Sequence, residues 1–198
     1  MVVLISTIYD FNAVVAGITR FNPGVLYLIV DESPDSIQKD AIEMILNTFG
    51  KVLDIKQVKT KVYDIVEVAG EVVRLIDAVP SKYEIFVNIS CGRKTQALGL
   101  LFGAYARAER VKTICYFVEE DKKMIVIPKC SYNLNNSENQ LLLELSKSPS
   151  LSLTEISEKT SLSKAIIYRN LRELKTKSLI VDFEKGFALT DFGKIAIL

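Results

Sequence analysis

From Met1 to about Pro128, short apolar segments alternate with amphipathic ones. The apolar segments predict β-strands, at residues 2–8, 25–31, 52–60, 84–90, 112–120 and 123–128. Helical periodicity predicts helices at about residues 11–20, 34–49, 63–79 and 94–109. Such alternation is typical of a parallel sheet that is covered on both faces. We therefore predict an α/β fold with a Rossmann-like, mainly parallel sheet, helices on both faces, and a closing hairpin around residues 120–122.

After residue 130 the pattern becomes polar and then purely helical. Residues 131–136 are predicted as a linker between a first domain at 1–130 and a second domain at 137–198. In the second domain, three helical segments precede a two-stranded hairpin that turns at Lys185 and Gly186. This order of elements predicts a small winged helix-turn-helix domain.

Three helix starts have recognisable capping signals. Ser33 is expected to cap a helix whose first residue is Pro34, since proline is favoured at that position. Two pairs with capping-box spacing are expected to begin the first two helices of the second domain: Ser137 with Gln140, and Ser152 with Glu155.

Composition narrows the possible chemistry. The 198 residues contain no histidine, which excludes catalytic triads that use it and leaves metal binding mostly to carboxylates. The three cysteines, Cys91, Cys115 and Cys130, have no CxxC spacing and indicate neither a zinc site nor a disulfide framework. No apolar run is long enough to span a bilayer, and the N-terminus lacks a basic signal-peptide region. We expect a cytoplasmic protein with no membrane partner, no metal, no cofactor and no catalytic residue.

Positive charge is concentrated in the third helix of the second domain, although the whole chain carries a net charge of only +1. Ile167, Leu171 and Leu174 recur at helical spacing and should face the core. The other side of the helix is typical of a recognition helix, and Lys185 on the hairpin would contact the DNA backbone. The predicted DNA-binding residues are Ser163, Lys164, Ala165, Tyr168, Arg169, Arg172 and Lys185. The alternative is a solvated basic face on a protein-binding domain.

A second candidate site follows the strand at residues 84–90, where the chain enters a helix. Ligands of open α/β sheets bind at the carboxyl ends of the strands, where the strand order reverses. With the order 3-2-1-4, the loops after the first and fourth strands meet there. A helix N-terminus with cations beside it suits an anion. The residues expected to face each other are Thr7, Tyr9, Asp10 and Phe11 on one loop, and Ser90, Gly92, Arg93, Lys94 and Thr95 on the other.

Three enzymatic sites fit this loop poorly. A P-loop is excluded because Arg93 separates the glycine from the lysine and because position 87 is valine. A dinucleotide site would need glycines after the first strand, and Asp31, at the end of the second strand, is better interpreted as a loop cap. A metal-dependent nuclease would need several acids there, and only Asp10 qualifies. A capped helix with solvated cations also remains possible.

The segment NISCGRKTQAL, residues 88–98, resembles the ligand loop of CARF domains, the CRISPR-associated Rossmann folds. The resemblance implies a homodimer that binds a cyclic oligoadenylate, most often the tetraadenylate, across its two-fold axis. It adds Asn88 and Cys91 to the ligand-binding residues, with Cys91 standing where the family usually has a glycine.

The segment from Leu153 to Ile180 resembles bacterial and archaeal winged-helix regulators, with Ser178 in place of their usual glycine. Together the two domains resemble archaeal CRISPR-associated transcriptional regulators. The resemblance implies a ligand-responsive regulator that binds double-stranded promoter DNA. The alternatives are a ring nuclease that cleaves its cyclic oligoadenylate, and a non-catalytic adaptor whose winged helix binds protein.

The helix predicted at residues 94–109 is apolar nearly all round and should be buried on more than one side. Its small residues Gly99, Gly103 and Ala106 would allow another helix to approach closely. That helix could belong to a second subunit or to the same chain, and the periodicity favours neither.

Overall fold

The computed structural model describes residues 1–118, 120–121, 123–128, 134–184 and 186–198. Residues 1–131 and 132–198 form two compact units, and each is described here by itself. No described helix is both long enough and apolar enough to cross a membrane. Cys130, Lys185 and residues 131–133 of the predicted linker lie outside the described residues.

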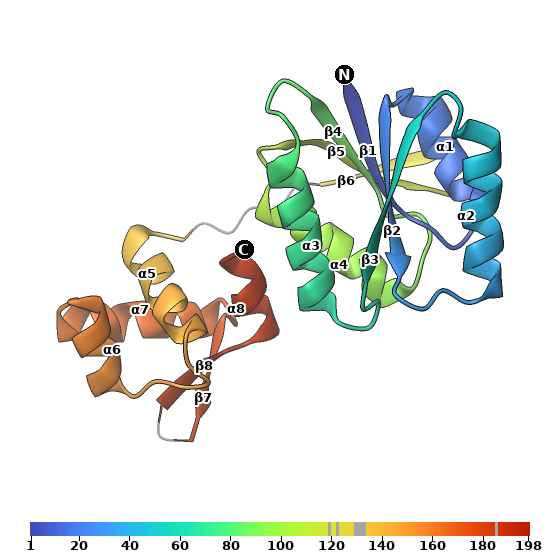
Figure 1. Ribbon diagram of the computed structural model, residues 1–198. Coiled ribbons are helices and arrows are strands. Elements are labelled where there is room, and N and C mark those ends of the chain that lie inside the picture. Colours follow the sequence, from blue (N-terminus) through green and yellow to red (C-terminus); the bar gives the residue numbers. More distant parts are fainter. Residues whose placement is uncertain (119, 122, 129–133, 185) are drawn as a thin grey trace. The chain divides into compact units, whose positions relative to one another are not determined.

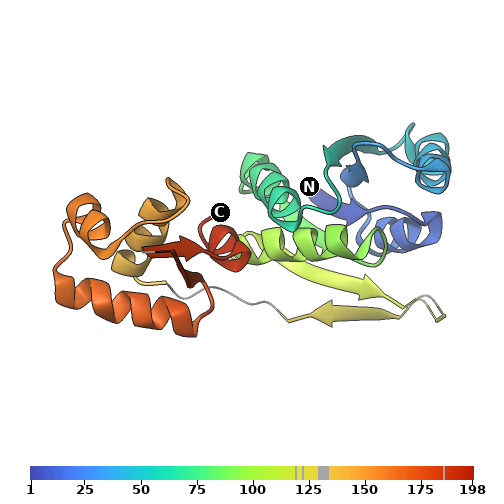
Figure 2. The ribbon, with the colours of Figure 1, turned by 90° about the horizontal axis from the view of Figure 1, so that it is seen from below.

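The first unit contains a six-stranded sheet of order β3-β2-β1-β4-β5-β6 (Figure 1). Its strands are β1 (Val2–Thr7), β2 (Val25–Asp31), β3 (Asp54–Thr60), β4 (Glu84–Asn88), β5 (Val111–Phe117) and β6 (Met124–Ile127). All neighbouring strands are parallel except β5 and β6, which run side by side in opposite directions (Figure 2). This confirms the predicted α/β fold, its strand order and its closing antiparallel pair.

Two helices cover each face of the sheet (Figure 1). One face carries α1 (Phe11–Phe21) and α2 (Ser36–Phe49), and the other carries α3 (Ile65–Ala78) and α4 (Lys94–Ala106). Leu4 and Ile5 on β1 are both fully buried, one in each core, because successive side chains of a strand point to opposite faces. The apolar runs of the central strands follow from burial on both faces.

The glycines of α4 face α3 within the same chain. A Cβ atom on Gly99 would lie 2.5 Å from Cβ of Val68, and one on Gly103 would lie 2.7 Å from Cβ of Val72. Only glycine therefore allows the two helices to pack this closely. The glycines are thus explained by packing inside one chain, and they do not support an interface between subunits.

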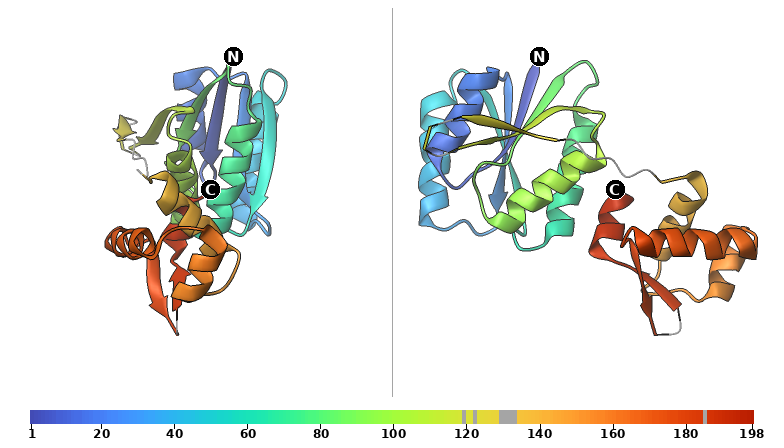
Figure 3. Two further views of the ribbon diagram at one scale, coloured as in Figure 1. Left: turned by 90° about the vertical axis from the view of Figure 1, so that its left-hand side faces the viewer. Right: turned by 180° about the vertical axis from the view of Figure 1, so that it is seen from behind.

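The second unit contains three helices, a hairpin and a short final helix (Figure 3). Its elements are α5 (Asn136–Ser146), α6 (Leu153–Thr160), α7 (Lys164–Thr176), β7 (Ile180–Phe183), β8 (Gly186–Leu189) and α8 (Asp191–Ala196). Ile167, Leu171 and Leu174 lie in its core, as their spacing predicted. The sequence analysis did not predict α8, whose start is marked by Thr190 accepting a hydrogen bond from the Gly193 N–H.

Two of the three predicted helix caps are wrong. Asp35, and not Ser33, caps α2, so Pro34 lies outside the helix. Asn135 forms a capping box with Glu138 at the start of α5, so the expected Ser137–Gln140 box is absent. Each correct cap is an Asp or Asn within two residues of the predicted one, and these residues cap at least as well as serine.

The Ser152–Glu155 capping box is confirmed at the start of α6. Ser178 adopts φ +57° after α7, in the left-handed region that favours glycine. A serine therefore adopts here a backbone conformation in which glycine is usual after a helix.

Candidate functional site

A cavity of about 590 Å³ opens at the carboxyl ends of β1 and β4, beside the first turns of α4. Both predicted loops contribute to it, as the strand order requires. Its lining residues are Tyr9, Asp10, Ile89, Ser90, Cys91, Gly92, Lys94, Ala97, Leu98, Leu101 and Tyr116. The cavity thus has a polar end at the two loops and an apolar side along α4.

The N-terminus of α4 lies at the polar end and has no side-chain cap. Arg93 occupies the capping position without accepting a hydrogen bond from the helix, whereas each of the other helices in the described part of the chain has a side-chain cap. The first N–H groups of α4 and the positive end of its dipole are therefore available to an anion. Lys94, which is exposed and lines the cavity, adds a positive charge.

Gly92 allows the loop after β4 to lie directly on β1. Its φ of +93° is left-handed, and a Cβ atom there would lie 2.8 Å from both Cβ of Thr7 and Oε1 of Gln96. Thr7 is fully buried and donates its hydroxyl hydrogen bond to the carbonyl of Cys91. Thr7 thus anchors the loop to β1 through this hydrogen bond and does not line the cavity.

Hydrogen bonds of Asn88 and Ser90 fix the start of the loop after β4. The Asn88 amide donates to the carbonyl of Ala13 at 3.0 Å, and its oxygen accepts hydrogen bonds from the N–H and the hydroxyl of Ser90. The Ser90 hydroxyl also accepts a hydrogen bond from the Phe117 N–H at 2.8 Å. Asn88 is fully buried and Ser90 nearly so, and their hydrogen bonds fix the conformation of the loop beside the cavity.

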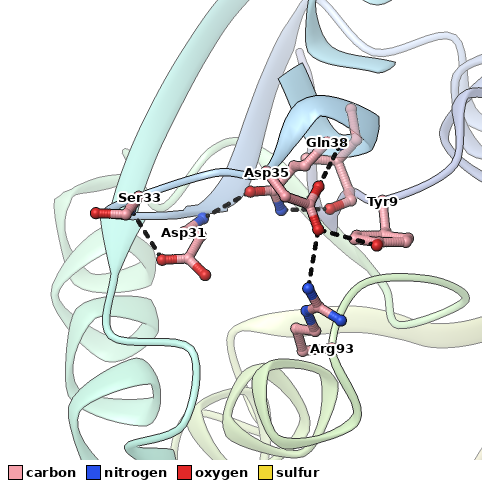
Figure 4. A network of polar contacts seen from close by, with 7 residues as sticks. Tyr9, Asp31, Ser33, Asp35, Gln38 and Arg93 are labelled. Atoms are coloured by element: carbon pink, nitrogen blue, oxygen red, sulfur yellow. Dashed lines mark hydrogen bonds and ion pairs between the residues drawn. The ribbon is translucent and has the colours of Figure 1, made fainter. Parts of the chain in front are cut away.

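Arg93 does not line the cavity, and its guanidinium reaches Asp35 at the start of α2 (Figure 4). Its Nη2 lies 2.9 Å from Oδ2 of Asp35, and the same oxygen accepts a hydrogen bond from the Tyr9 hydroxyl at 3.0 Å. The guanidinium also lies 4.9 Å from the centre of the Tyr9 ring. The other Asp35 oxygen caps α2 by accepting from the N–H of Gln38 at 2.9 Å. Arg93 is therefore held from two sides by residues of two other loops.

This network shifts two pKa values. The hydrogen bond from the Gln38 N–H lowers the pKa of Asp35, and the Tyr9 hydroxyl and Arg93 lower it further. The hydrogen bond to Asp35 raises the pKa of Tyr9. At neutral pH Asp35 is therefore a carboxylate and Tyr9 a neutral phenol.

Of the remaining predicted ligand residues, Phe11 and Thr95 do not line the cavity, whereas Asp10 does. Phe11 packs at the edge of the α1–α2 core, and the Thr95 hydroxyl donates to the carbonyl of Val62 at 2.5 Å. Asp10 lines the cavity and caps α1. The two loops thus bring together Tyr9, Asp10, Ser90, Cys91, Gly92 and Lys94, and leave Thr7, Phe11, Asn88, Arg93 and Thr95 outside the lining.

Two residues beside the site, Asp35 and Gln38, were not predicted from the sequence. Their spacing, Asp-x-x-Gln at a helix start, is a capping-box signal. Gln38 in fact donates to the carbonyl of Ile8 at 2.7 Å and accepts from the N–H of Asp31 at 3.1 Å, so it ties the loops after β1 and β2 together. Asp31 accepts from the N–H of Ser33, which confirms its interpretation as a loop cap (Figure 4).

The described cysteines are poor nucleophiles. Burial raises the pKa of the Cys91 thiol, and it raises the pKa of Cys115 to about 12. Among the described residues, no group of three histidine, cysteine or carboxylate side chains is placed to hold a metal ion.

In the second unit, α7 presents an exposed face with three cations. Lys164, Ala165, Tyr168, Arg169 and Arg172 are all exposed, while Ile167 on the opposite side is buried. Ser163 caps the helix by accepting a hydrogen bond from the Ile166 N–H. Lys185, the predicted contact on the hairpin, lies outside the described residues.

Comparison with protein families gives one match for the first unit. The family model described as HFX_2341_N:-like, N-terminal matches residues 1–123. No curated protein matches the sequence.

Three solved structures with a similar fold have 10–13% sequence identity to this chain. Can2 from Sulfobacillus thermosulfidooxidans, solved in complex with cyclic tetra-adenylate, has a TM-score of 0.52 at 11% identity over 99% of this chain. Protein VC1899 from Vibrio cholerae has a TM-score of 0.51 at 10% identity over 98% of this chain. Enterococcus italicus Csm6, bound to cyclic hexa-2'-fluoro-hexa-dAMP, has a TM-score of 0.50 at 13% identity over 89% of this chain.

The chain spans 64% of Can2, 64% of VC1899 and 54% of Csm6. At 10–13% identity this similarity shows a shared fold, a Rossmann-like α/β sheet covered by helices on both faces.

Proposed function

The chain belongs to the HFX_2341_N:-like, N-terminal family, and on that premise we propose that it is a cytoplasmic, CRISPR-associated regulator that binds a cyclic oligoadenylate and promoter DNA. The ligand would be cyclic tetraadenylate, bound by a homodimer of the first unit. The second unit would be a winged helix-turn-helix domain that binds the DNA.

The observation that carries the ligand proposal is the uncapped N-terminus of α4 beside Lys94, at the cavity of about 590 Å³. A cyclic oligoadenylate offers phosphates, which suit free N–H groups and a cation, and adenines, which suit an apolar wall. Ala97, Leu98 and Leu101 supply such a wall on the same helix. Can2 and Csm6, which have this fold, were each solved with a cyclic oligonucleotide bound.

The ligand proposal is tested by titrating the full chain with fluorescent cyclic tetraadenylate and measuring anisotropy. Lys94→Ala should weaken binding roughly tenfold, because a charge-assisted hydrogen bond to phosphate is lost. Lys51→Ala is the matched control, since this exposed lysine precedes the amino end of β3, whereas the cavity lies at the carboxyl ends of the parallel strands β1 and β4. No binding by the wild type, or equal losses in both variants, would contradict the proposal.

The DNA proposal rests on the exposed cationic face of α7. Within the described residues, Lys164, Arg169 and Arg172 form no ion pair within 4 Å, although the charge of Arg169 acts on Glu138, and their exposed side chains can meet phosphates and base edges. The order of three helices and a hairpin supports the proposed winged helix-turn-helix, in which the third helix would enter the major groove.

A mobility shift with DNA from upstream of the gene's own neighbourhood tests this part. Arg169→Ala should cost about 1–3 kcal/mol and relax the preference at one base pair, if the residue contacts guanine. Lys147→Ala, at the far end of α5, should leave the affinity unchanged. A wild-type protein that captures no DNA would favour the protein-binding adaptor instead.

The proposal assigns binding, and not catalysis, to the cavity. The Ser90 hydroxyl is engaged with Asn88 and Phe117, and burial raises the pKa of the Cys91 thiol, so neither group is poised as a nucleophile. A ring could still be cut by its own 2′-hydroxyl if the site held it in line. Incubation with labelled cyclic tetraadenylate and chromatography would reveal linear products, and their appearance would make the protein a ring nuclease.

A further inference from the structure

Gln96 is fully buried, and neither polar atom of its side chain has a hydrogen-bond partner in the structure. It occupies the third position of α4, directly under the loop that lines the cavity, because its Oε1 lies 2.8 Å from where a Cβ atom of Gly92 would be. An unpaired buried amide is costly, whereas an apolar side chain of the same shape would be nearly neutral there.

Gln38 provides a comparison within the same chain. It also occupies the third position of a helix that follows a parallel strand, and it is 2% exposed. Both of its polar atoms are paired, with the carbonyl of Ile8 and the N–H of Asp31. Burial at this position therefore does not by itself leave a glutamine unpaired.

The third position of a helix also has a usual partner, the N–H of the capping residue. Glu138 and Glu155 make that bond at the starts of α5 and α6. Gln96 likewise stands three residues after the capping residue, Arg93, but its side chain makes no hydrogen bond to the Arg93 N–H. The helix that lacks a side-chain cap is thus also the one whose third residue holds unused hydrogen-bonding groups.

We propose that Gln96 is a positioning residue for the ligand-bound state. When an anionic ligand occupies the N-terminus of α4, the loop at residues 91–93 shifts and its backbone pairs with the Gln96 amide. The hydrogen bonds gained then contribute to ligand affinity. This inference rests on the proposed binding of cyclic tetraadenylate and names a residue outside the lining of the cavity.

The proposal predicts opposite effects on stability and on affinity. Gln96→Met removes the unpaired polar atoms with little change in shape, so the free protein should unfold at a higher temperature, by about 2–6 °C. The same change should weaken binding of cyclic tetraadenylate roughly tenfold. A residue that only fills the core would not produce both effects.

The experiment uses the full chain in three forms: wild type, Gln96→Met and Gln38→Met. Thermal unfolding without ligand should rank Gln96→Met above the wild type and Gln38→Met below it, since Gln38→Met leaves two backbone groups unpaired. Anisotropy with cyclic tetraadenylate measures affinity. Hydrogen exchange should show ligand-induced protection at residues 91–96 in the wild type that is reduced in Gln96→Met.

The measurements distinguish a failure of the proposed function from a failure of the inference about Gln96. Wild-type protein that binds no cyclic tetraadenylate overturns the proposed function and this inference together. Wild-type binding with unchanged affinity in Gln96→Met overturns the inference alone. An unfolding temperature for Gln96→Met at or below that of the wild type also overturns it, because the amide would then already be paired, for example by a buried water.

Discussion

Arg93 and Lys94 are adjacent in sequence, and both were predicted to supply charge to the ligand. The structure separates them: Lys94 lines the cavity, while Arg93 reaches Asp35 on the loop after β2. The capping residue of a helix has extended backbone, so its side chain leaves in a different direction from that of the next residue. Asp35 therefore acts as an internal anion for one of the two cations.

This pairing predicts that Asp35→Asn tightens binding of cyclic tetraadenylate several-fold. The amide keeps the shape of the side chain, while a negative charge near the site is removed and Arg93 loses its anionic partner. Asp54→Asn makes the same change in net charge at the amino end of β3, away from the carboxyl ends where the cavity lies, and is the control. Anisotropy titrations of both variants measure the difference.

A double variant shows whether Asp35 affects ligand binding through Arg93 or directly. If Asp35 acts by holding Arg93, then Asp35→Asn should bring little gain in an Arg93→Ala background. An equal gain in both backgrounds would mean that the carboxylate acts on the ligand directly. Weaker binding by Asp35→Asn itself would contradict the internal-anion interpretation.

At the scale of elements, α4 illustrates what the sequence determines. Its apolar composition on all sides predicted burial on more than one side, but within one chain its buried residues form a single stripe: Gln96, Gly99, Leu100, Gly103 and Ala104. Periodicity could not identify the partner, since a glycine accommodates a helix of its own chain as well as one of another. The structure places α3 against Gly99 and Gly103, and leaves Leu98 43% exposed beside the cavity.

Gly103→Ala should therefore lower the free energy of unfolding without changing the oligomeric state. The added methyl group would overlap Val72 and the carbonyl of Ala69, an overpacking that typically costs about 1–3 kcal/mol. Denaturant unfolding measures the loss, and light scattering measures the mass. Loss of a dimer at unchanged stability would contradict the assignment of this side of α4 to α3.

Leu98 gives the complementary prediction. If the homodimer forms through the exposed side of α4, Leu98→Glu should shift it toward monomers, because a charge would be buried at the interface. Its stability as a monomer should barely change, since the side chain is half exposed. Light scattering at several concentrations decides this, and a mass that stays dimeric would place the interface elsewhere.

The Glu138–Lys177 pair links α5 to the end of α7. Burial alone would raise the pKa of Glu138, but hydrogen bonds from Lys177 and from the Asn135 N–H outweigh it and lower the pKa below its ordinary value. A carboxyl group with a lowered pKa stabilises the fold above its unfolded pKa of about 4.3, and this stability is lost as the pH falls through the folded value.

Glu138→Gln should therefore cost about 1–2 kcal/mol at pH 7, and the difference from the wild type should shrink steadily below about pH 4. Urea unfolding from pH 7 to pH 3 measures it. Glu158→Gln, an exposed acid on α6, is the control. A difference that does not depend on pH would show that the loss comes from packing and not from charge.

The pattern of the chain was sufficient for the order and type of the main elements, but not for their boundaries or for the closure of the site. Serine, aspartate and asparagine stand close together before α2 and α5, and each is a good cap. Asp35 is favoured because its carboxylate also meets Tyr9 and Arg93, which are distant in sequence. Such tertiary contacts, like the unpaired state of Gln96, are visible only once the strands are placed.

At the scale of the whole molecule, the proposed function requires that ligand binding and DNA binding both shift the same conformational equilibrium of the dimer. Ligand on the first unit and DNA on the second can regulate each other only if each favours the same state of the dimer. We expect cyclic tetraadenylate to change DNA affinity by roughly 5–150-fold, or about 1–3 kcal/mol. Linkage then requires DNA to change the affinity for cyclic tetraadenylate by the same factor.

Two anisotropy titrations, each with and without the other partner at saturation, measure both factors. Lys94→Ala should bind DNA normally without ligand and should need more ligand to change that affinity. Arg169→Ala should bind ligand normally while requiring more DNA, because the residue lies on the exposed face of α7. Unequal factors would mean that a further species, such as free monomer, takes part in the equilibrium. Equal DNA affinity with and without saturating ligand would leave two binding sites and no switch, and the regulatory part of the proposal would be wrong.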